Sequence, residues 1–334
     1  MNINRYTIMS MQKNLPIYTG IDIGTSEVRC IIGYLGADGT SNYSIAGVGT
    51  APCQGVRKGV IVHPEEVAEA LHAAIEEAER QAGVKIRSAS VLIGGSHISS
   101  QTSRGVVAIG GAGRIITEED RTRVEEAATT IQMPTNREII QVFAKHYRID
   151  GDEIIKDPIG MQGVRLEVDE QIITASTPAI RSLGHALGRI GVNANNYVVA
   201  GLAAAESVLD RRQKESGTAV IDIGAGTTSI AVLEEGEIEH ISVLPVGGQH
   251  ITNDLAIGLR TSLDIAEKVK LAFSGLDDIS LGECSVEHNG EKIIFDKSTV
   301  KMIVESRVEE MLELIDKEFI KIRKSKKLPG GVVF

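Results

Sequence analysis

The chain of 334 residues lacks any run of about 18 apolar residues, the length that a membrane-spanning helix needs. Its N-terminus also lacks the short apolar core of a secretory signal peptide. We therefore expect a chain that neither crosses a membrane nor leaves the cell. Hydrophobic residues make up 42% and charged residues 24% of the sequence, as in ordinary globular proteins, and the length allows two domains or more.

Cysteines and cations are also scarce. The three cysteines, Cys30, Cys53 and Cys284, are scattered and have no metal-binding or redox spacing, which indicates a reducing cytoplasm. Lysine and arginine total 35 against 45 aspartates and glutamates, a net charge of -10. A general nucleic-acid binder neutralises phosphates with surplus cations, so nucleic acid is not an expected partner.

One pattern occurs twice, at Gly20–Gly33 and at Val220–Val232. In each copy an apolar run leads to an aspartate, a turn of small residues follows, and a second apolar run leaves the turn. This pattern predicts two strands joined by a tight turn with a carboxylate at its mouth. The repetition indicates a duplicated unit whose two turns can face each other across a cleft.

Both turns have the chemistry of a phosphate site. Their glycines let backbone N–H groups approach an anion closely, and their hydroxyls add donors. The candidate residues are Gly24, Thr25, Ser26, Gly224, Ala225, Gly226, Thr227 and Thr228. Asp22 and Asp222 would repel a phosphate unless a cation stood between them, and carboxylates suit Mg²⁺ that keeps some of its waters. One copy could be an ordinary edge hairpin, but the pair favours phosphate binding.

Between the copies, apolar residues after Pro64 recur at helical spacing, which predicts a helix packed on a sheet. Over residues 88–175, short β-like runs surround one helix that begins after Thr117, and we predict an inserted small α+β subdomain. Two histidines of this segment, His97 and His146, fit no metal-ligand pattern and are expected to be ordinary strand residues.

After the second copy, helices are predicted at 251–259 and 262–273. An apolar stripe then predicts a long helix from Ser298 to about Lys326, and the cations at its end favour neutralisation of the helix dipole over membrane contact. Residues 330–334 begin what should be another strand, so we expect the chain to be a fragment.

The duplicated turns resemble the phosphate-1 and phosphate-2 loops of the superfamily of actin, heat-shock chaperone and sugar-kinase ATPases. Within it the chain resembles the FtsA family of bacterial cell-division proteins, from Ile17 to Phe334. The most telling motif is Pro158–Leu166, which lies in the insertion, where that family carries a subdomain called 1C that actin and the chaperones do not have at that place. Gly55–Ile61 and Val91–Ile98 also resemble the family.

This resemblance implies an α/β fold: a duplicated actin-like (ribonuclease H-like) ATPase with two lobes around a nucleotide cleft and an inserted small α+β subdomain. The implied division is a flexible leader at 1–14, a first lobe (1A) at 15–87 and 176–212, the insert (1C) at 88–175, a second-lobe core (2A) at 213–246 and 328–334, and an outer subdomain (2B) at 247–327.

The implied cofactors are ATP and Mg²⁺, with the metal held through water by Asp22 and Asp222 and the phosphates cradled by the two turns. Glu267 and Lys270 match the Glu-x-x-Lys with which the superfamily holds ribose and adenine, and they share a helix face. Such a pair alone is more often a surface ion pair, so this assignment depends on the resemblance.

Two departures from the superfamily are expected to matter. Gly201 aligns with the Glu or Gln that orients the hydrolytic water in actin and chaperones, so hydrolysis should be slow. The adenosine loop and the amphipathic helix that ties FtsA to the membrane are expected beyond Phe334. We therefore expect this chain to bind nucleotide less completely and to lack its own anchor, while the full-length protein is peripheral at the inner face of the membrane at the division site.

The implied partners are further copies of the chain, contacted through the insert to form filaments, and other division proteins. The C-terminal peptide of FtsZ, the tubulin-like division protein, is expected on the lobe at 247–327. Cations of this lobe that could meet an acidic peptide are Lys268, Lys270, Lys301 and Arg307.

Three other interpretations remain. A pilus-assembly actin-like ATPase shares the superfamily. A sugar or small-molecule kinase uses the same phosphate cradle plus an acceptor base, but no acceptor pocket is evident. A chaperone is disfavoured because no substrate-binding β-domain follows.

Overall fold

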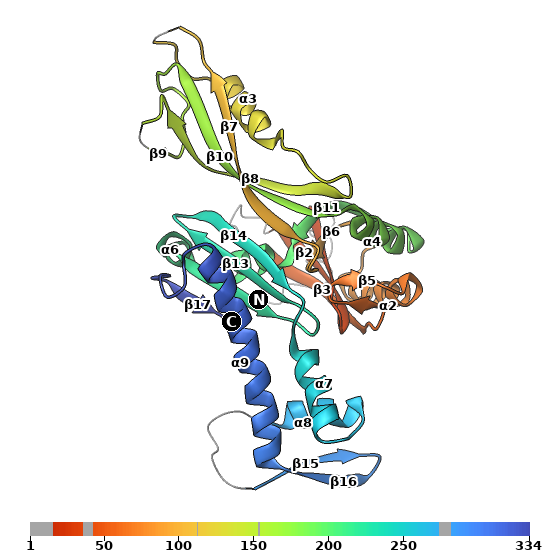
Figure 1. Cartoon of the computed structure of the whole chain (residues 1–334). Coiled ribbons are helices and arrows are strands. Elements are labelled where there is room, and N and C mark those ends of the chain that lie inside the picture. Colours follow the sequence, from red (N-terminus) through yellow and green to blue (C-terminus); the bar gives the residue numbers. More distant parts are fainter. Residues whose placement is uncertain (1–15, 36–42, 112, 153, 274–281) are drawn as a thin grey trace, which may run out of the picture.

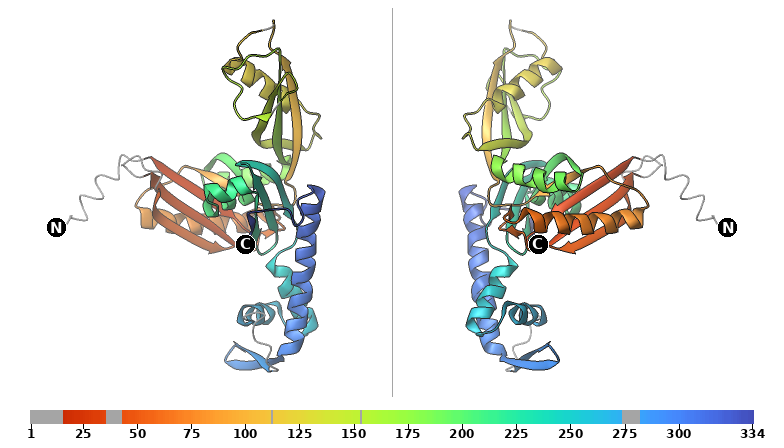
Figure 2. Two further views of the ribbon diagram at one scale, coloured as in Figure 1. Left: turned by 90° about the vertical axis from the view of Figure 1, so that its left-hand side faces the viewer. Right: turned by 90° about the vertical axis from the view of Figure 1, so that its right-hand side faces the viewer.

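The computed structural model describes residues 16–35, 43–111, 113–152, 154–273 and 282–334, and the predicted leader at 1–14 lies outside them. Two lobes form a central body (Figure 1). One subdomain projects from each end of that body, so the described part of the molecule is elongated in both side views (Figure 2).

The first lobe is built on a five-stranded sheet with the order β11-β6-β1-β2-β3. Its strands are β1 (Ile17–Ile23), β2 (Glu27–Leu35), β3 (Tyr43–Pro52), β6 (Ser88–Ile93) and β11 (Asn193–Val199). Helices α2 (Pro64–Ala82) and α4 (Thr177–Arg189) and the short hairpin of β4 (Val56–Arg57) and β5 (Val60–Ile61) complete this lobe. The first predicted strand–turn–strand unit is thus β1 and β2.

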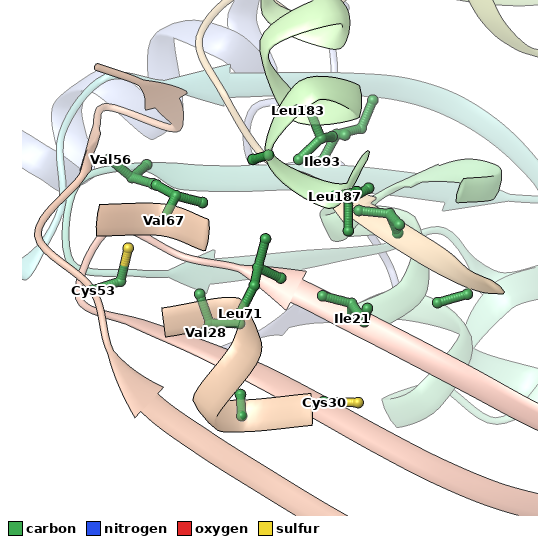
Figure 3. Packing of buried hydrophobic residues seen from close by; sticks show 14 of the residues in the cluster. Ile21, Val28, Cys30, Cys53, Val56, Val67, Leu71, Ile93, Leu183 and Leu187 are labelled. Atoms are coloured by element: carbon green, nitrogen blue, oxygen red, sulfur yellow. The ribbon is translucent and has the colours of Figure 1, made fainter. Parts of the chain in front are cut away.

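Alternation along β2 explains which face is covered. Val28, Cys30 and Ile32 are fully buried, whereas Ile31 between them is 43% exposed. The buried face packs on α2, whose Val67 and Leu71 lie beside the strand residues (Figure 3). The predicted helix after Pro64 is therefore confirmed.

The sequence placed β6 in the insert, and this boundary is wrong. Residues Ser90 to Leu92 of β6 pair in parallel with Gly20 to Asp22 of β1, and β6 also pairs with β11. β6 is therefore a central strand of the first lobe, and the insert begins after it. Parallel pairing joins segments far apart in the chain, so no local pattern revealed this partner.

The insert is a four-stranded sheet, β7-β10-β8-β9, with one helix against it. Its elements are β7 (Ser99–Ala108), α3 (Glu118–Thr129), β8 (Arg137–Ile149), β9 (Ile154–Ile155) and β10 (Arg165–Ser176). Helix α3 begins with a capping box between Thr117 and Asp120. His97 lies in the turn before β7 instead of a strand, whereas His146 lies in β8 as predicted.

One long strand, β10, covers a stretch in which the sequence shows two short β-like runs, 163–168 and 171–174, divided by charged residues. The two charged residues that separate those runs, Asp169 and Glu170, are both buried, and Asp169 is paired with arginines. Asp169 accepts hydrogen bonds from Arg104 Nε (2.6 Å) and Arg148 Nη1 (2.8 Å). Burial alone would raise the pKa of Asp169, but these guanidinium groups outweigh it and lower the pKa to about 2.

Glu170 has the opposite environment. It is 2% exposed, and its Oε2 has no hydrogen-bond partner among the described residues. Burial, with a smaller contribution from the charge of Glu125, raises the pKa of Glu170 from 4.5 to about 7. The folded state therefore holds this proton more tightly than the unfolded chain, so its stabilising effect is complete below pH 4.5 and is lost as the pH rises to 7.

We therefore predict that Glu170→Gln stabilises the insert at pH 8, by up to about 3 kcal/mol, and changes little at pH 4.5. Urea unfolding of the variant and the wild type at both pH values measures this. Glu126→Gln, on the exposed side of α3, is the matched control and should have no pH-dependent effect. Equal effects of Glu170→Gln at both pH values would contradict the assignment.

The second lobe repeats the hairpin in a four-stranded sheet, β14-β13-β12-β17. Its strands are β12 (Thr218–Ile223), β13 (Thr228–Glu234), β14 (Glu237–Leu244) and β17 (Gly331–Val333). Helices α5 (Ala200–Val208) and α6 (Arg211–Ser216) lead into it. The outer subdomain contains α7 (Gly248–Gly258), α8 (Leu263–Ala272), β15 (Glu283–His288) and β16 (Glu291–Asp296). The predicted helices at 251–259 and 262–273 are present with shifted ends.

Helix α9 (Lys297–Lys321) joins the outer subdomain to the second-lobe core (Figure 1). Val300 near its start packs in the outer cluster, and Ile315 and Phe319 near its end pack against the second-lobe sheet. The helix ends five residues earlier than predicted, because Arg323 has a left-handed backbone (φ 60°).

Candidate functional site

The two turns are closed by the same hydrogen bond. The N–H of Gly24 donates to the carbonyl of Glu27 at 3.0 Å, and the N–H of Gly224 donates to the carbonyl of Thr227 at 2.9 Å. The duplication predicted from sequence therefore holds at the level of single backbone contacts.

The turns also touch each other. A methyl group added at Gly226 would stand 2.6 Å from Thr25 Oγ1, closer than packed atoms allow. Glycine at this position lets the second-lobe turn reach the first-lobe turn. The two predicted phosphate loops thus meet between the lobes.

A cavity of about 1020 Å³ opens beside this contact, large enough for a nucleotide-sized ligand. The predicted site residues that line it are Thr25, Ser26, Gly224, Ala225, Gly226, Glu267 and Lys270. Those that do not line it are Asp22, Gly24, Asp222, Thr227 and Thr228. The Thr228 hydroxyl is buried and donates to the carbonyl of Val246 at 2.8 Å, so it serves the fold in this structure.

Each aspartate is the second-last residue of its strand, Asp22 in β1 and Asp222 in β12. Asp22 is half-buried and lies 3.6 Å from Arg29 Nη1. Burial raises the pKa of Asp22; the Arg29 charge lowers it, and the nearby charges of Asp222 and Glu27 raise it. Since the charge of Asp222 acts on Asp22, a cation between the two carboxylates would relieve this repulsion, and the pair fits a water-held Mg²⁺.

No group of three or more histidine, cysteine, aspartate or glutamate residues in the described ranges could hold a metal directly.

Glu267 and Lys270 form an ion pair (2.7 Å) inside the cavity instead of on an open surface. Thr252 of α7 joins them, donating its hydroxyl to Glu267 and receiving a hydrogen bond from Lys270 Nζ at 3.1 Å. Burial would raise the pKa of Glu267, but the hydrogen bonds from Lys270 and Thr252 outweigh it and hold the pKa below its usual value. The pair therefore stays charged and fixed.

The second turn is held by the start of α7. The N–H groups of Gly248 and Gln249 donate to the carbonyls of Gly224 (2.9 Å) and Ala225 (2.8 Å). Gly247 permits this approach, because a methyl group there would stand 2.4 Å from the Gly224 carbonyl oxygen. Helix α7 thus contacts both the second candidate phosphate-binding turn and the Glu267–Lys270 pair.

Gly201 is buried near the start of α5, where an added methyl group would stand 3.4 Å from Ser229 Cβ. No described residue of α5 lines the cavity. Sequence reasoning missed Arg57, Lys58, Thr252 and His250, which do line it. The first two lie within the Gly55–Ile61 motif, and two adjacent cations there are a signal that could have been used.

Comparison with known families decides the wider identity. The family model described as "SHS2 domain inserted in FTSA" matches residues 95–174, and the model "Cell division protein FtsA" matches residues 219–329. The cell division protein FtsA of Bacillus subtilis (strain 168) is 37% identical over 325 residues, covering 96% of this chain and 73% of that protein. The chain belongs to the FtsA family. The FtsA of Pseudomonas aeruginosa is 35% identical, over 94% of this chain and 76% of that relative.

Solved structures confirm the actin-like fold. The PilM-PilN type IV pilus biogenesis complex matches with a TM-score of 0.63 at 15% identity, over 92% of this chain and 77% of that chain. The ethanolamine utilization protein EutJ from Carboxydothermus hydrogenoformans matches with a TM-score of 0.51 at 17% identity, over 92% and 72%. At these identities the likeness concerns the fold alone. This FtsA-family chain is thus an actin-like cell-division protein, and the pilus-assembly alternative is not favoured.

Proposed function

We propose that this FtsA-family protein binds ATP with Mg²⁺ in the cavity between its two lobes. One observation carries this proposal: the two turns of a duplicated hairpin, each preceded by an aspartate, meet at the wall of a nucleotide-sized cavity. Backbone N–H groups and the hydroxyls of Thr25 and Ser26 would donate hydrogen bonds to the phosphate oxygens. Glu267 and Lys270 would hold the sugar and base.

Bound Mg²⁺ would neutralise part of the phosphate charge. Asp22 and Asp222 are the residues that would hold its waters, and Arg29 would keep Asp22 in place. The nucleotide would then bridge the lobes and set their relative geometry, which an assembly contact can detect.

We predict that the wild-type chain binds the ATP–Mg complex but turns it over well below the roughly 10 s⁻¹ typical of enzymes. The described cavity wall offers no side chain from α5 to orient water, and Glu267 is already engaged by Lys270. Isothermal titration and a steady-state phosphate-release assay test both halves. No binding would refute the site, and ordinary enzymatic rates would refute the slow turnover.

A small-molecule kinase is the alternative with the same cradle. It would release or transfer phosphate quickly only when its acceptor is present. An assay of ADP formation with a panel of sugars and polyols separates the two functions, because a kinase forms ADP as it phosphorylates its acceptor, whereas an assembly protein should show no stimulation.

Assembly partners form part of the same proposal. We propose that the outer subdomain takes the C-terminal peptide of FtsZ, although most of its candidate cations are engaged: Lys270 with Glu267, Lys301 with Glu305 and Arg307 with Asp254. Exposed apolar side chains, among them Ile257 (77% exposed) and Leu271 (74% exposed), therefore offer the stronger contact.

Its place of action is proposed to be the cytoplasmic side of the division site. None of the helices in the described ranges is both long and apolar enough to span a bilayer. Attachment to the inner face of the membrane and contact with other division proteins remain part of the proposal. A fluorescent fusion imaged during division, with and without depletion of FtsZ, tests it.

A further inference from the structure

The β4–β5 hairpin places two cations on the first-lobe wall of the cavity. Arg57 and Lys58 both line this wall, and both are exposed. Within the described ranges neither side chain takes part in a hydrogen bond or an ion pair. They are therefore available to a ligand.

Backbone contacts place this hairpin beside the first candidate phosphate-binding turn, which contains Thr25 and Ser26. The N–H of Cys53 donates to the carbonyl of Ser26 at 2.9 Å, which ties the end of β3 to that turn. The Gly55 carbonyl then accepts hydrogen bonds from the N–H groups of Val62 and His63, closing the base of the hairpin. Arg57 and Lys58 thus lie only a few residues along the chain from Cys53, which contacts the turn.

The tip of the hairpin is fixed as well. Val56 is buried in the first-lobe core, and a methyl group at Gly59 would stand 2.4 Å from the Gly94 carbonyl oxygen. Between them Lys58 has φ 52°, in the left-handed region that glycine adopts more easily. With Gly59 at φ 73°, Lys58 forms the two-residue turn that joins β4 to β5, and this turn fixes where its side chain leaves the hairpin.

The charge balance of the cavity indicates an anionic ligand. The chain carries a net charge of -10, yet the charged residues that line this cavity are three cations, Arg57, Lys58 and Lys270, against two carboxylates, Asp264 and Glu267. Lys270 is already neutralised by Glu267. Unpaired cations at the wall of a cleft attract anions and bind phosphate oxygens through charge-assisted hydrogen bonds.

We propose that Arg57 and Lys58 are a third phosphate-binding arm, which holds the terminal phosphates of a nucleoside triphosphate against the two turns. This inference rests on the proposed ATP site. It adds the residues that distinguish nucleotides by the number of their phosphates. A triphosphate carries more charge within their reach than a monophosphate, so the arm favours ATP over AMP.

The test is a comparison of ATP, ADP and AMP binding, each with excess Mg²⁺, by isothermal titration. In Arg57→Gln/Lys58→Gln we expect ATP affinity to fall by roughly 10-fold or more per side chain, ADP affinity by less, and AMP affinity to stay unchanged. Inorganic tripolyphosphate should compete with ATP in the wild type and lose this ability in the variant. Arg212→Gln/Lys292→Gln removes the same charge from exposed positions outside the cavity wall and should leave all affinities unchanged.

Two further variants separate binding from folding. Lys58→Gly relieves the left-handed backbone, so its melting temperature should not fall, yet its ATP affinity should fall as in Lys58→Gln. Lys58→Arg should keep most of the affinity.

The outcomes distinguish this inference from the proposed function. Failure of the wild type to bind ATP would overturn both. A wild type that binds ATP, with the double glutamine variant keeping the same preference for ATP over AMP, would overturn the third arm and leave the ATP site standing.

Discussion

Replacing Asp22 or Asp222 by alanine is expected to weaken binding of the ATP–Mg complex by roughly 100-fold, the upper end of what loss of a metal's outer-shell partner costs. Each change removes one of the two carboxylates proposed to hold the waters of Mg²⁺. Asp222 is exposed and Asp22 half-buried, and neither belongs to a hydrophobic cluster, so the fold should survive. Isothermal titration measures the affinity, and thermal melting measures the fold.

Asparagine variants refine this test because they keep the shape and remove only the charge. Asp22→Asn should bind the ATP–Mg complex as weakly as the wild type does at a pH low enough to protonate Asp22. Because the pKa of Asp22 is raised, the wild type should begin to lose affinity at a higher pH than it would with an ordinary aspartate. Asp152→Asn, exposed on the insert, is the matched control. Unchanged affinity in both Asp22→Ala and Asp222→Ala would refute the magnesium assignment.

Charges placed on the insert are expected to abolish filaments while ATP binding persists. Only heterologous contacts propagate into an open filament, and the insert adds nothing to the described cavity wall, so we propose it as one of the two surfaces. Two adjoining segments there present exposed apolar side chains, Ile115 (54% exposed) and Met161 (43% exposed), joined by a hydrogen bond from the Ile116 N–H to the Met161 carbonyl at 2.8 Å.

Ile115→Glu/Met161→Glu should therefore leave the protein monomeric in a pelleting assay and in negative-stain electron microscopy with ATP–Mg. Val208→Glu/Ile320→Glu introduces the same charges at exposed apolar positions on α5 and α9 and should still assemble. Binding of an FtsZ C-terminal peptide should persist in both. Filaments of normal spacing from the insert variant would show that this surface is not the contact.

The structure also dictates how the insert can be removed. Deleting 88–175, the predicted boundaries, would take out β6 from the middle of the first-lobe sheet. Ser99 and Thr174 are direct partners in the β7–β10 register, so a deletion of 100–173 leaves ends one strand spacing apart that a short Gly/Ser link can join.

Local patterns predicted what local interactions decide. The two hairpins and α2 follow from alternation and helical spacing over neighbouring residues, and Asp22 and Asp222 were found because the hairpin is duplicated. Long-range pairing was not predictable in this way. The parallel partner of β6 lies about 70 residues earlier in the chain.

Burial of charge explains the other differences. Asp169 and Glu170 interrupt the apolar pattern of β10 in the sequence, yet both are buried within that one strand. The sequence pattern of β10 could not predict this for Asp169, because the guanidinium groups that neutralise it come from other strands. Arg57 and Lys58 look like an exposed turn in the sequence, and only the position of Cys53 against Ser26 shows what they face. The hydroxyl of Thr228 fits the phosphate pattern but is already bonded to Val246.

Helix α9 makes the outer subdomain a lever. Its 25 residues, about 37 Å long at the usual rise, belong at one end to the second-lobe core and at the other to the outer cluster. Because one continuous helix is built into both cores, the outer subdomain cannot swing without carrying the second-lobe sheet, and with it the turn that touches Thr25. A rotation of about 10° at the cavity would therefore displace the far end of α9 by about 6 Å. Small movements around the proposed nucleotide site would therefore produce large displacements at the far end of the outer subdomain.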